Sequence, residues 1–190
     1  MEAKIVTYTG KVFNFLNPKP EMVCIEDIAH SLANLCRYTG HVRKFYSVGE
    51  HSILMALSDK CPGDSMSKLL HDAAEAYIGD MASPWKRLLN IALDCDDVLS
   101  LKEYEPIVLK VISEALGVPI NITAEVKTSD MIMLATEVRD LMPSNDVWGD
   151  LPEPLEERIP WWKPAYVEQH FLNIYSQLKA LRRLANAKGV

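Results

Sequence analysis

Cysteines are few in this chain, and none lies in a Cys-x-x-Cys pair. The four are widely spaced along 190 residues, at Cys24, Cys36, Cys61 and Cys95. That spacing argues against a structural zinc finger and against a framework of disulfide bonds. Sparse, scattered thiols are typical of a protein in a reducing compartment, so a cytoplasmic location is expected.

Long apolar runs are absent as well. No stretch reaches the ~20 consecutive apolar residues that a membrane-spanning helix needs, and no cationic segment followed by an apolar one stands at the N-terminus. Neither a membrane partner nor a signal peptide is therefore expected.

An excess of positive charge is also missing. The 20 lysines and arginines are outnumbered by 26 aspartates and glutamates, which gives a formal net charge of −6. Nucleic-acid-binding proteins usually carry a basic face, so a nucleic acid is not expected as a partner. A small anionic ligand is still compatible with this charge, because a local cluster of Arg and Lys can oppose the global sign.

The chain does have a clear helical pattern after a short β segment. Residues 4–8 and 12–16 flank Thr9-Gly10-Lys11, which predicts a β-hairpin within an N-terminal extension of residues 1–20. The apolar spacing that follows predicts helices over residues 26–36, 48–59, 65–78, 94–116, 123–142 and about 166–187, with a helical turn starting at Pro84. The expected fold class is all-α, a single domain over residues 1–190 built as a helical bundle with a small N-terminal β-hairpin.

Two local features refine this outline. Ser47 is a plausible N-cap for the second helix, with Glu50 at the third position of a capping box. Residues 143–165 form a proline-rich loop, and long loops in compact domains often serve as lids or oligomer contacts. Its tryptophans at positions 148, 161 and 162 could supply such contacts or pack within the monomer.

Four metal-type side chains stand on helical segments. His71 and Asp72 are adjacent in one predicted helix, His51 lies on the helix before it, and Asp130 lies on a later one. Asp130 shares a face at three- and four-residue spacing with Val126, Met133, Leu134, Glu137 and Leu141. A carboxylate buried on such a face must be paired or metal-bound, because an isolated buried charge costs several kcal/mol.

Two imidazoles and two carboxylates suit a divalent metal ion such as zinc, cobalt, manganese or magnesium. A bound metal lowers the pKa of a coordinated water and polarises a phosphoryl oxygen. Spacing alone leaves a structural interpretation open, because a single helical histidine more often has an ordinary structural role. His30 and His170 are assigned that role, while His41 lies in the polar loop before His51.

The order of these residues resembles the HD-domain metal-dependent phosphohydrolases. The segments Ser47–Ser52 and Leu70–Asp80 are similar to the branch that contains bacterial 5′-deoxynucleotidases and phage-type dATP triphosphohydrolases, and the similarity runs from about Ile25 to Leu141. The resemblance implies an HD-type bundle, a divalent metal bound by the four side chains, and a small deoxynucleotide substrate. It also implies a homo-oligomer, a dimer or a hexamer.

The resemblance implies catalytic roles for two acidic residues. Glu75 lies one helical turn after His71, so it faces the same site and could act as a general acid or orient the attacking water. A solvent-facing glutamate is the alternative. Asp80 follows Gly79 in a turn, where Asp is common for conformational reasons alone, so contact with the sugar, proton transfer and a turn role all stay open.

Substrate contacts are implied for five residues: Arg37, Tyr38, Pro84, Trp85 and Lys86. Arg37 stands near the position of a phosphate-binding arginine, whose planar fork suits phosphate oxygens. Lys86 would face the phosphate groups of the substrate, and Pro84 would face its base. Tyr38 and Trp85 are candidates for stacking on the base, although core packing is the commoner role of such rings.

These features predict an enzyme that hydrolyses the ester between the 5′ oxygen of a deoxynucleoside and its α-phosphorus. A triphosphohydrolase that prefers dATP and releases triphosphate is favoured, because Lys86 beside Pro84 adds cationic reach beyond one phosphate. The alternative substrate is a deoxynucleoside monophosphate. Two further alternatives are a non-catalytic nucleotide-binding HD module and a purely structural helical oligomerisation domain.

Overall fold

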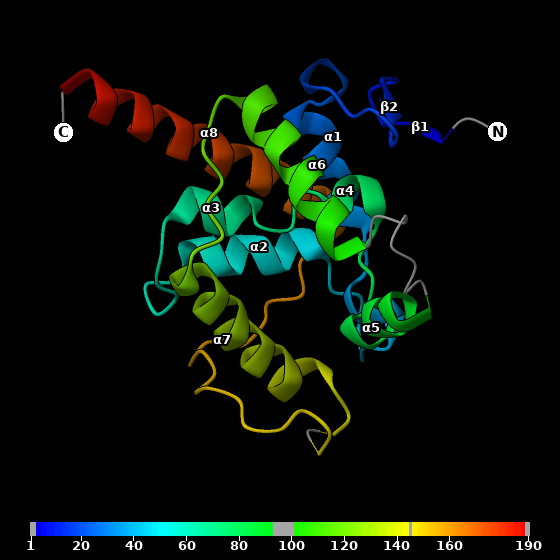
Figure 1. The fold of residues 1–190 in the computed structure, drawn as a ribbon. Helices are drawn as coiled ribbons and strands as arrows, with labels where there is room; N and C mark the ends of the chain where they lie inside the picture. Colours follow the sequence, from blue (N-terminus) through cyan, green and yellow to red (C-terminus); the bar gives the residue numbers. More distant parts are fainter. Residues whose placement is uncertain (1–2, 93–100, 145, 189–190) are drawn as a thin grey trace.

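The computed structural model describes residues 3–92, 101–144 and 146–188. The expected hairpin is confirmed: β1 (Lys4–Val6) pairs antiparallel with β2 (Val12–Asn14), and Gly10 takes a positive φ of 86° in the turn. The rest is helical, so the all-α fold class is confirmed (Figure 1). The helices are α1 (Ile25–Asn34), α2 (Val48–Leu57), α3 (Ser65–Leu70), α4 (Glu75–Ile78), α5 (Ser83–Ala92), α6 (Leu101–Leu116), α7 (Ala124–Leu141) and α8 (Pro164–Lys188), with 3₁₀ turns η1 (Pro20–Met22) and η2 (Arg37–Gly40).

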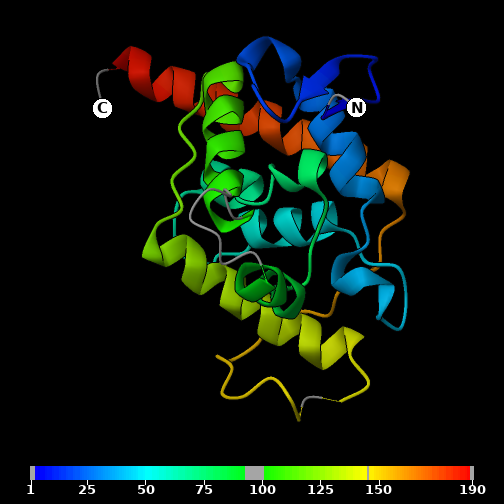
Figure 2. The ribbon, with the colours of Figure 1, turned by 45° about the vertical axis from the view of Figure 1, so that its right-hand side comes forward.

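Helix α2 lies at the centre of the molecule. It contacts α1, α3 and α8 and also α7, which lies on the side opposite α1 and α8 (Figures 1 and 2). Eight of its residues are buried, including polar ones, so it has no solvent-facing stripe and behaves as a core helix. Gly49 allows the close packing, because a Cβ there would lie 2.8 Å from Cγ1 of Val167 on α8.

The helix expected over residues 65–78 is interrupted. Helix α3 ends at Leu70 and α4 begins at Glu75, with residues 71–74 forming a tighter turn. Amides there bond three residues back, from Ala73 to the Leu70 carbonyl at 3.0 Å and from Glu75 to that of Asp72 at 2.9 Å, as in a 3₁₀ helix. Gly79 ends α4 with a φ of 82°, as expected.

Other predicted boundaries differ by a few residues or more. Helix α1 ends at Asn34 instead of residue 36, because Leu35 is extended and Cys36 forms a β-bridge with Ser47. The turn expected at Pro84 is a full helix, α5. The helix expected over 94–116 is described from Leu101 as α6, and residues 94–100 of that prediction lie outside the described ones.

The capping box is only half formed. The Ser47 hydroxyl accepts a hydrogen bond from the amide of Glu50 at 3.0 Å, which confirms the N-cap. The Glu50 carboxylate does not complete the box. Its Oε1 instead accepts from the amide of Trp162 at 3.0 Å, so this side chain fastens the segment that leads into α8.

The proline-rich segment between α7 and α8 packs on the molecule itself. The amide of Leu155 donates to the Thr136 hydroxyl at 2.9 Å, and the amide of Ile159 donates to Asp140 at 3.0 Å. Leu155 and Ile159 are buried. The segment is therefore tied along α7 at several points. Within the described chain, no helix is both long and apolar enough to cross a membrane.

Candidate metal centre

Three parts of the fold bring the four metal-type side chains together. Nε2 of His51, on α2, lies 3.2 Å from Nε2 of His71 in the turn after α3. Oδ2 of Asp72 lies 3.1 Å from the His71 nitrogen and 3.9 Å from that of His51. Oδ1 of Asp130, on α7, lies 3.3 Å and 4.0 Å from the nitrogens of His51 and His71. The side chains thus converge on one point, as their residue types predict for a metal site.

The tautomers of both imidazoles follow from their outer contacts. Nδ1 of His71 lies 2.8 Å from the Lys68 carbonyl oxygen, and Nδ1 of His51 lies 2.5 Å from Oε1 of Glu137. Both oxygens only accept hydrogen bonds, so in the neutral rings each Nδ1 carries the proton. Each Nε2 therefore points a lone pair at the other and at the carboxylates.

Four acceptor atoms that face one another need a cation between them. The five separations that involve an imidazole nitrogen, 3.1–4.0 Å, are close to the ~3.4 Å expected between tetrahedral ligands with bonds of about 2.1 Å. The ligand atoms of His51, His71 and Asp72 all lie within 4.8 Å of one another, and Asp130 joins them through its contacts with the two imidazoles. The donor set, two neutral imidazoles and two carboxylates, fits a divalent ion.

The pKa shifts of His51 and Asp72 also indicate that positive charge is stabilised at this site. Burial and the charge of Arg37 would lower the pKa of His51, but the carboxylates of Glu137 and Asp130 outweigh them and raise it to about 9. Burial would raise the pKa of Asp72, yet the neighbouring His71, His51 and Arg37 hold it well below its usual range. Without a metal, a proton thus takes up part of the positive charge that the carboxylates attract.

Asp130 departs from its expected environment. The prediction placed it on a buried face, and Val126, Met133 and Leu141 on that face are indeed buried. The Asp130 side chain itself is 47% exposed. It points toward an open cavity instead of the core, so the cost of burying a charge was the wrong reason to select it.

Glu137 is the functional residue whose role the sequence left unresolved. It lies seven residues after Asp130 on α7 and is fully buried. Its Oε2 accepts hydrogen bonds from Arg37, at 3.2 Å, and from the hydroxyl of Tyr38. It orients His51, whereas the nearby Arg139 of the same helix pairs with Asp140. The spacing of seven residues, or two helical turns, between Asp130 and Glu137 was the sequence signal that both side chains lie on the same face of α7.

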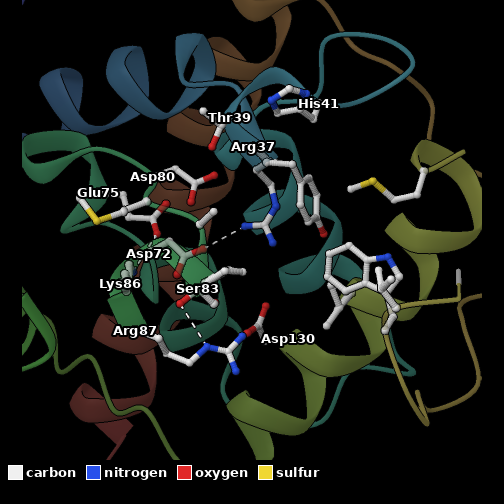
Figure 3. Close-up of a pocket in the computed structure, with 18 of the residues that line it drawn as sticks. Arg37, Thr39, His41, Asp72, Glu75, Asp80, Ser83, Lys86, Arg87 and Asp130 are labelled. Carbon is white, nitrogen blue, oxygen red and sulfur yellow. Dashed lines mark hydrogen bonds and ion pairs between the residues drawn. The ribbon is translucent and has the colours of Figure 1, made fainter. Parts of the chain in front are cut away.

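A cavity of about 740 Å³ opens beside the four side chains, and both predicted catalytic acids line it (Figure 3). The Glu75 side chain is 6% exposed, and its Oε2 has no hydrogen-bond partner among the described residues. Burial, followed by the charges of Asp72 and Asp80, raises the pKa of Glu75 well above its usual value. Burial also raises the pKa of Asp80.

Four of the five predicted substrate contacts line this cavity: Arg37, Tyr38, Pro84 and Lys86. Trp85 is 53% exposed and is not among the lining residues. Nζ of Lys86 lies 3.2 Å from Oε2 of Glu105 and 3.9 Å from Oε1 of Glu75. The lysine therefore stands in the cavity with part of its charge already balanced.

The lining residues that sequence reasoning did not select include Arg87, Glu105 and Trp148. Arg87 directly follows Lys86, so the helical continuation of α5 beyond Pro84 would have revealed it. Glu105 comes from α6, and no motif marks it. Trp148 was expected only to supply oligomer contacts from the proline-rich loop or to pack within the monomer.

No family model matches the chain, but two proteins are similar to it. The uncharacterized protein YfdR of Escherichia coli is 35% identical over 191 residues, which cover 95% of this chain and 98% of that protein. The uncharacterized protein RCAP_rcc00048 of Rhodobacter capsulatus is 29% identical over 151 residues, or 75% of this chain and 74% of that protein. With near-complete coverage at this identity, the chain belongs to the same family as YfdR.

Proposed function

We propose that this protein is a metal-dependent phosphohydrolase that cleaves the 5′ phosphoester of deoxynucleotides. The observation that carries the proposal is the convergence of His51, His71, Asp72 and Asp130 at the wall of a large cavity, with each carboxylate oxygen 3.1–4.0 Å from the two imidazole nitrogens. A divalent ion held there would polarise a phosphoryl oxygen and lower the pKa of a coordinated water.

Glu75 is the proposed general acid. Its carboxyl group lies at the cavity, and its raised pKa favours the protonated form, which has an O–H to donate. Its buried Oε2 has no hydrogen-bond partner within the described protein, so the protein does not hold the carboxyl group through that oxygen. Asp80, whose pKa is also raised, is the neighbouring carboxyl that would contact the sugar or relay the proton.

Arg37 is proposed to position Asp72 and to offset phosphate charge. Its guanidinium lies 3.4 Å from Asp72 and 3.2 Å from Glu137, and it is 12% exposed at the cavity wall. Lys86 and Arg87 add positive charge on α5 at the same wall. Arginine and lysine together can bind the oxygens of an entering phosphate.

The length of the phosphate chain divides the proposal into two candidates. Two cations on α5, Lys86 and Arg87, support a deoxynucleoside triphosphate with dATP as the first choice. The pairing of Lys86 with Glu105 supports the second candidate, a deoxynucleoside monophosphate, because it leaves less unbalanced charge for a polyphosphate tail. Both use the same attack on the α-phosphorus.

A cytoplasmic setting and a homo-oligomeric assembly, a dimer or a hexamer, belong to this proposal. The described cysteines, Cys24, Cys36 and Cys61, are free thiols, which suits a reducing compartment.

The test is a panel of deoxynucleoside mono- and triphosphates with zinc, cobalt, manganese or magnesium after chelator treatment. Separation of the products by chromatography distinguishes phosphate from triphosphate release. Hydrolysis of dATP with triphosphate release supports the first candidate, and hydrolysis of dAMP alone supports the second. Binding without hydrolysis under every metal would overturn the enzyme and leave a nucleotide-binding module.

A further inference from the structure

The cavity has two chemically different ends. The end next to the candidate metal centre is lined by charged side chains, including Glu75, Asp80 and Lys86 (Figure 3). The other end, the apolar end, is formed by η2, α7 and the segment after α7, which contribute the apolar and aromatic lining residues Tyr38, Leu134, Met142, Val147 and Trp148. A ligand that spans both ends therefore needs an anionic part and an apolar part.

Trp148 reaches this apolar end from the segment between α7 and α8. Its ring packs against that of Tyr38 in an edge-to-face arrangement, with 5.9 Å between centroids and 89° between planes. Gly149 follows at a φ of +67°, a conformation that favours glycine, so the chain turns directly after the tryptophan. The indole is only partly buried, and it thus retains surface for a ligand.

Tyr38 is a fixed support for that indole. Its hydroxyl donates to the buried Glu137, and the guanidinium of Arg37 lies 5.3 Å from its ring centroid. The same tyrosine therefore links the aromatic end of the cavity to the residues that orient the candidate metal ligands. A ring placed against Trp148 would lie at a fixed position relative to the charged end.

We propose that Trp148 is the residue that recognises the nucleobase, by stacking its indole on the base. The proposal rests on the proposed function, since it assigns the apolar half of the same substrate. A planar base suits an aromatic wall flanked by Leu134, Met142 and Val147, and stacking of this kind tolerates any base. Charged phosphates would lose solvation at this end without gaining partners of opposite charge.

The experiment compares a deoxynucleotide with the base-free ester that carries the same number of phosphates, 2-deoxyribose 5-triphosphate for dATP or 2-deoxyribose 5-phosphate for dAMP. Wild-type protein, Trp148→Ala and Trp148→Phe are assayed with the best metal of the panel. We expect Trp148→Ala to raise the KM for the deoxynucleotide about tenfold, within the range of base stacking, with little change in kcat. In Trp148→Ala the activity on the base-free ester stays at the wild-type level, and in Trp148→Phe the KM for the deoxynucleotide stays close to the wild-type value.

Two results overturn the assignment. An equal loss on both substrates means that Trp148→Ala acts through the fold and not through the base. A tenfold rise of KM in Trp85→Ala with no change in Trp148→Ala moves base recognition to the exposed tryptophan of α5.

Failure of the proposed function gives a different result, in which the wild-type protein hydrolyses neither substrate. Calorimetric titration with deoxyadenosine, which carries the base without phosphate, then decides the assignment separately. A Kd about tenfold weaker in Trp148→Ala supports the aromatic wall, whereas equal affinities, or no binding by either protein, overturn it.

Discussion

Nδ1 of His51 donates a hydrogen bond of 2.5 Å to Oε1 of Glu137, a carboxylate 86 positions later in the chain. The bond fixes the imidazole tautomer and turns Nε2 toward His71 and Asp130. Because Glu137 also accepts from Arg37 and Tyr38, one buried side chain connects the candidate metal centre with the cavity wall.

Replacing Glu137 by Gln tests this connection. The amide retains the shape but loses the charge that balances His51 and Arg37, so we expect metal affinity to fall 10- to 100-fold. The free energy of unfolding should fall by roughly 3 kcal/mol, because a buried ion pair loses one partner. Chelator-competition titration and urea denaturation measure the two effects. The exposed Glu153→Gln is the matched control, and unchanged metal affinity in Glu137→Gln would refute the orienting role.

The four candidate metal ligands should differ in their contribution to metal affinity according to their burial. His71→Ala removes a side chain that is 7% exposed, and we expect the bound metal to fall from one equivalent to nearly none. Asp130→Ala removes a 47% exposed ligand, so weaker but measurable binding should remain. Metal analysis after dialysis provides the readout, with His170→Ala as a histidine control outside the cavity. Stoichiometric metal in His71→Ala would favour the structural interpretation.

Glu75→Gln tests the proposed general acid. The amide cannot donate a proton to the leaving 5′ oxygen, so kcat should fall about 10²- to 10⁴-fold while the metal stays bound. Since the pKa of Glu75 is raised, the wild-type kcat should decline on the alkaline side, where the carboxyl loses its proton. Initial rates across pH check both statements. Glu105→Gln is a comparison variant from the same cavity, and an equal loss of kcat there would contradict a specific role for Glu75.

Metal binding should depend on pH through His51. Its pKa of about 9 means that a metal ion competes with a proton at neutral pH, so affinity should rise about tenfold per pH unit up to that value. The stability of the metal-free protein should instead fall as the pH rises. A raised pKa contributes stability that is complete below the ordinary value near 6.5 and is lost as pH rises through about 9. Chelator competition and thermal unfolding between pH 6 and 9.5 test the pair of trends, and a flat affinity profile would rule out proton competition at this site.

Most of the helical fold could be predicted from the sequence, but one break in a helix at the candidate site could not. Apolar spacing predicted α7 and α8 closely, because each has a regular face that packs on the core. It did not predict the break at residues 71–74, since the buried Ala73 and Ala74 continue the apolar pattern through it.

Side-chain partners across the fold were harder to predict. Residue types and order selected His51, His71, Asp72 and Asp130, and the structure brings all four together. The contact of Trp148 with Tyr38 depends on the path of the segment after α7, which carries no periodic pattern. Contacts of this kind are set by loop backbone and not by spacing along the chain.

The last prediction concerns the packing that holds α2 in place. A Cβ on Gly49 would lie 2.8 Å from Cγ1 of Val167 and 3.2 Å from the amide nitrogen of Ala33. Gly49→Ala should therefore destabilise the fold by about 1–3 kcal/mol through overpacking, and Val167→Ala should cost about 2 kcal/mol by leaving a cavity. In the double variant the lost methyl makes room for the new one.

The double variant should consequently cost less than the sum of the single changes, by at least ~0.5 kcal/mol. Recovery stays incomplete because the backbone of α1, at Ala33, does not move away. Ile174→Ala, two turns further along α8, is the control for the cycle and should combine additively with Gly49→Ala. Urea denaturation of the metal-free variants gives all the free energies. Additive costs for Gly49→Ala and Val167→Ala would show that this contact does not set the spacing of α2 and α8, and the position of His51 would then depend on its hydrogen bond to Glu137.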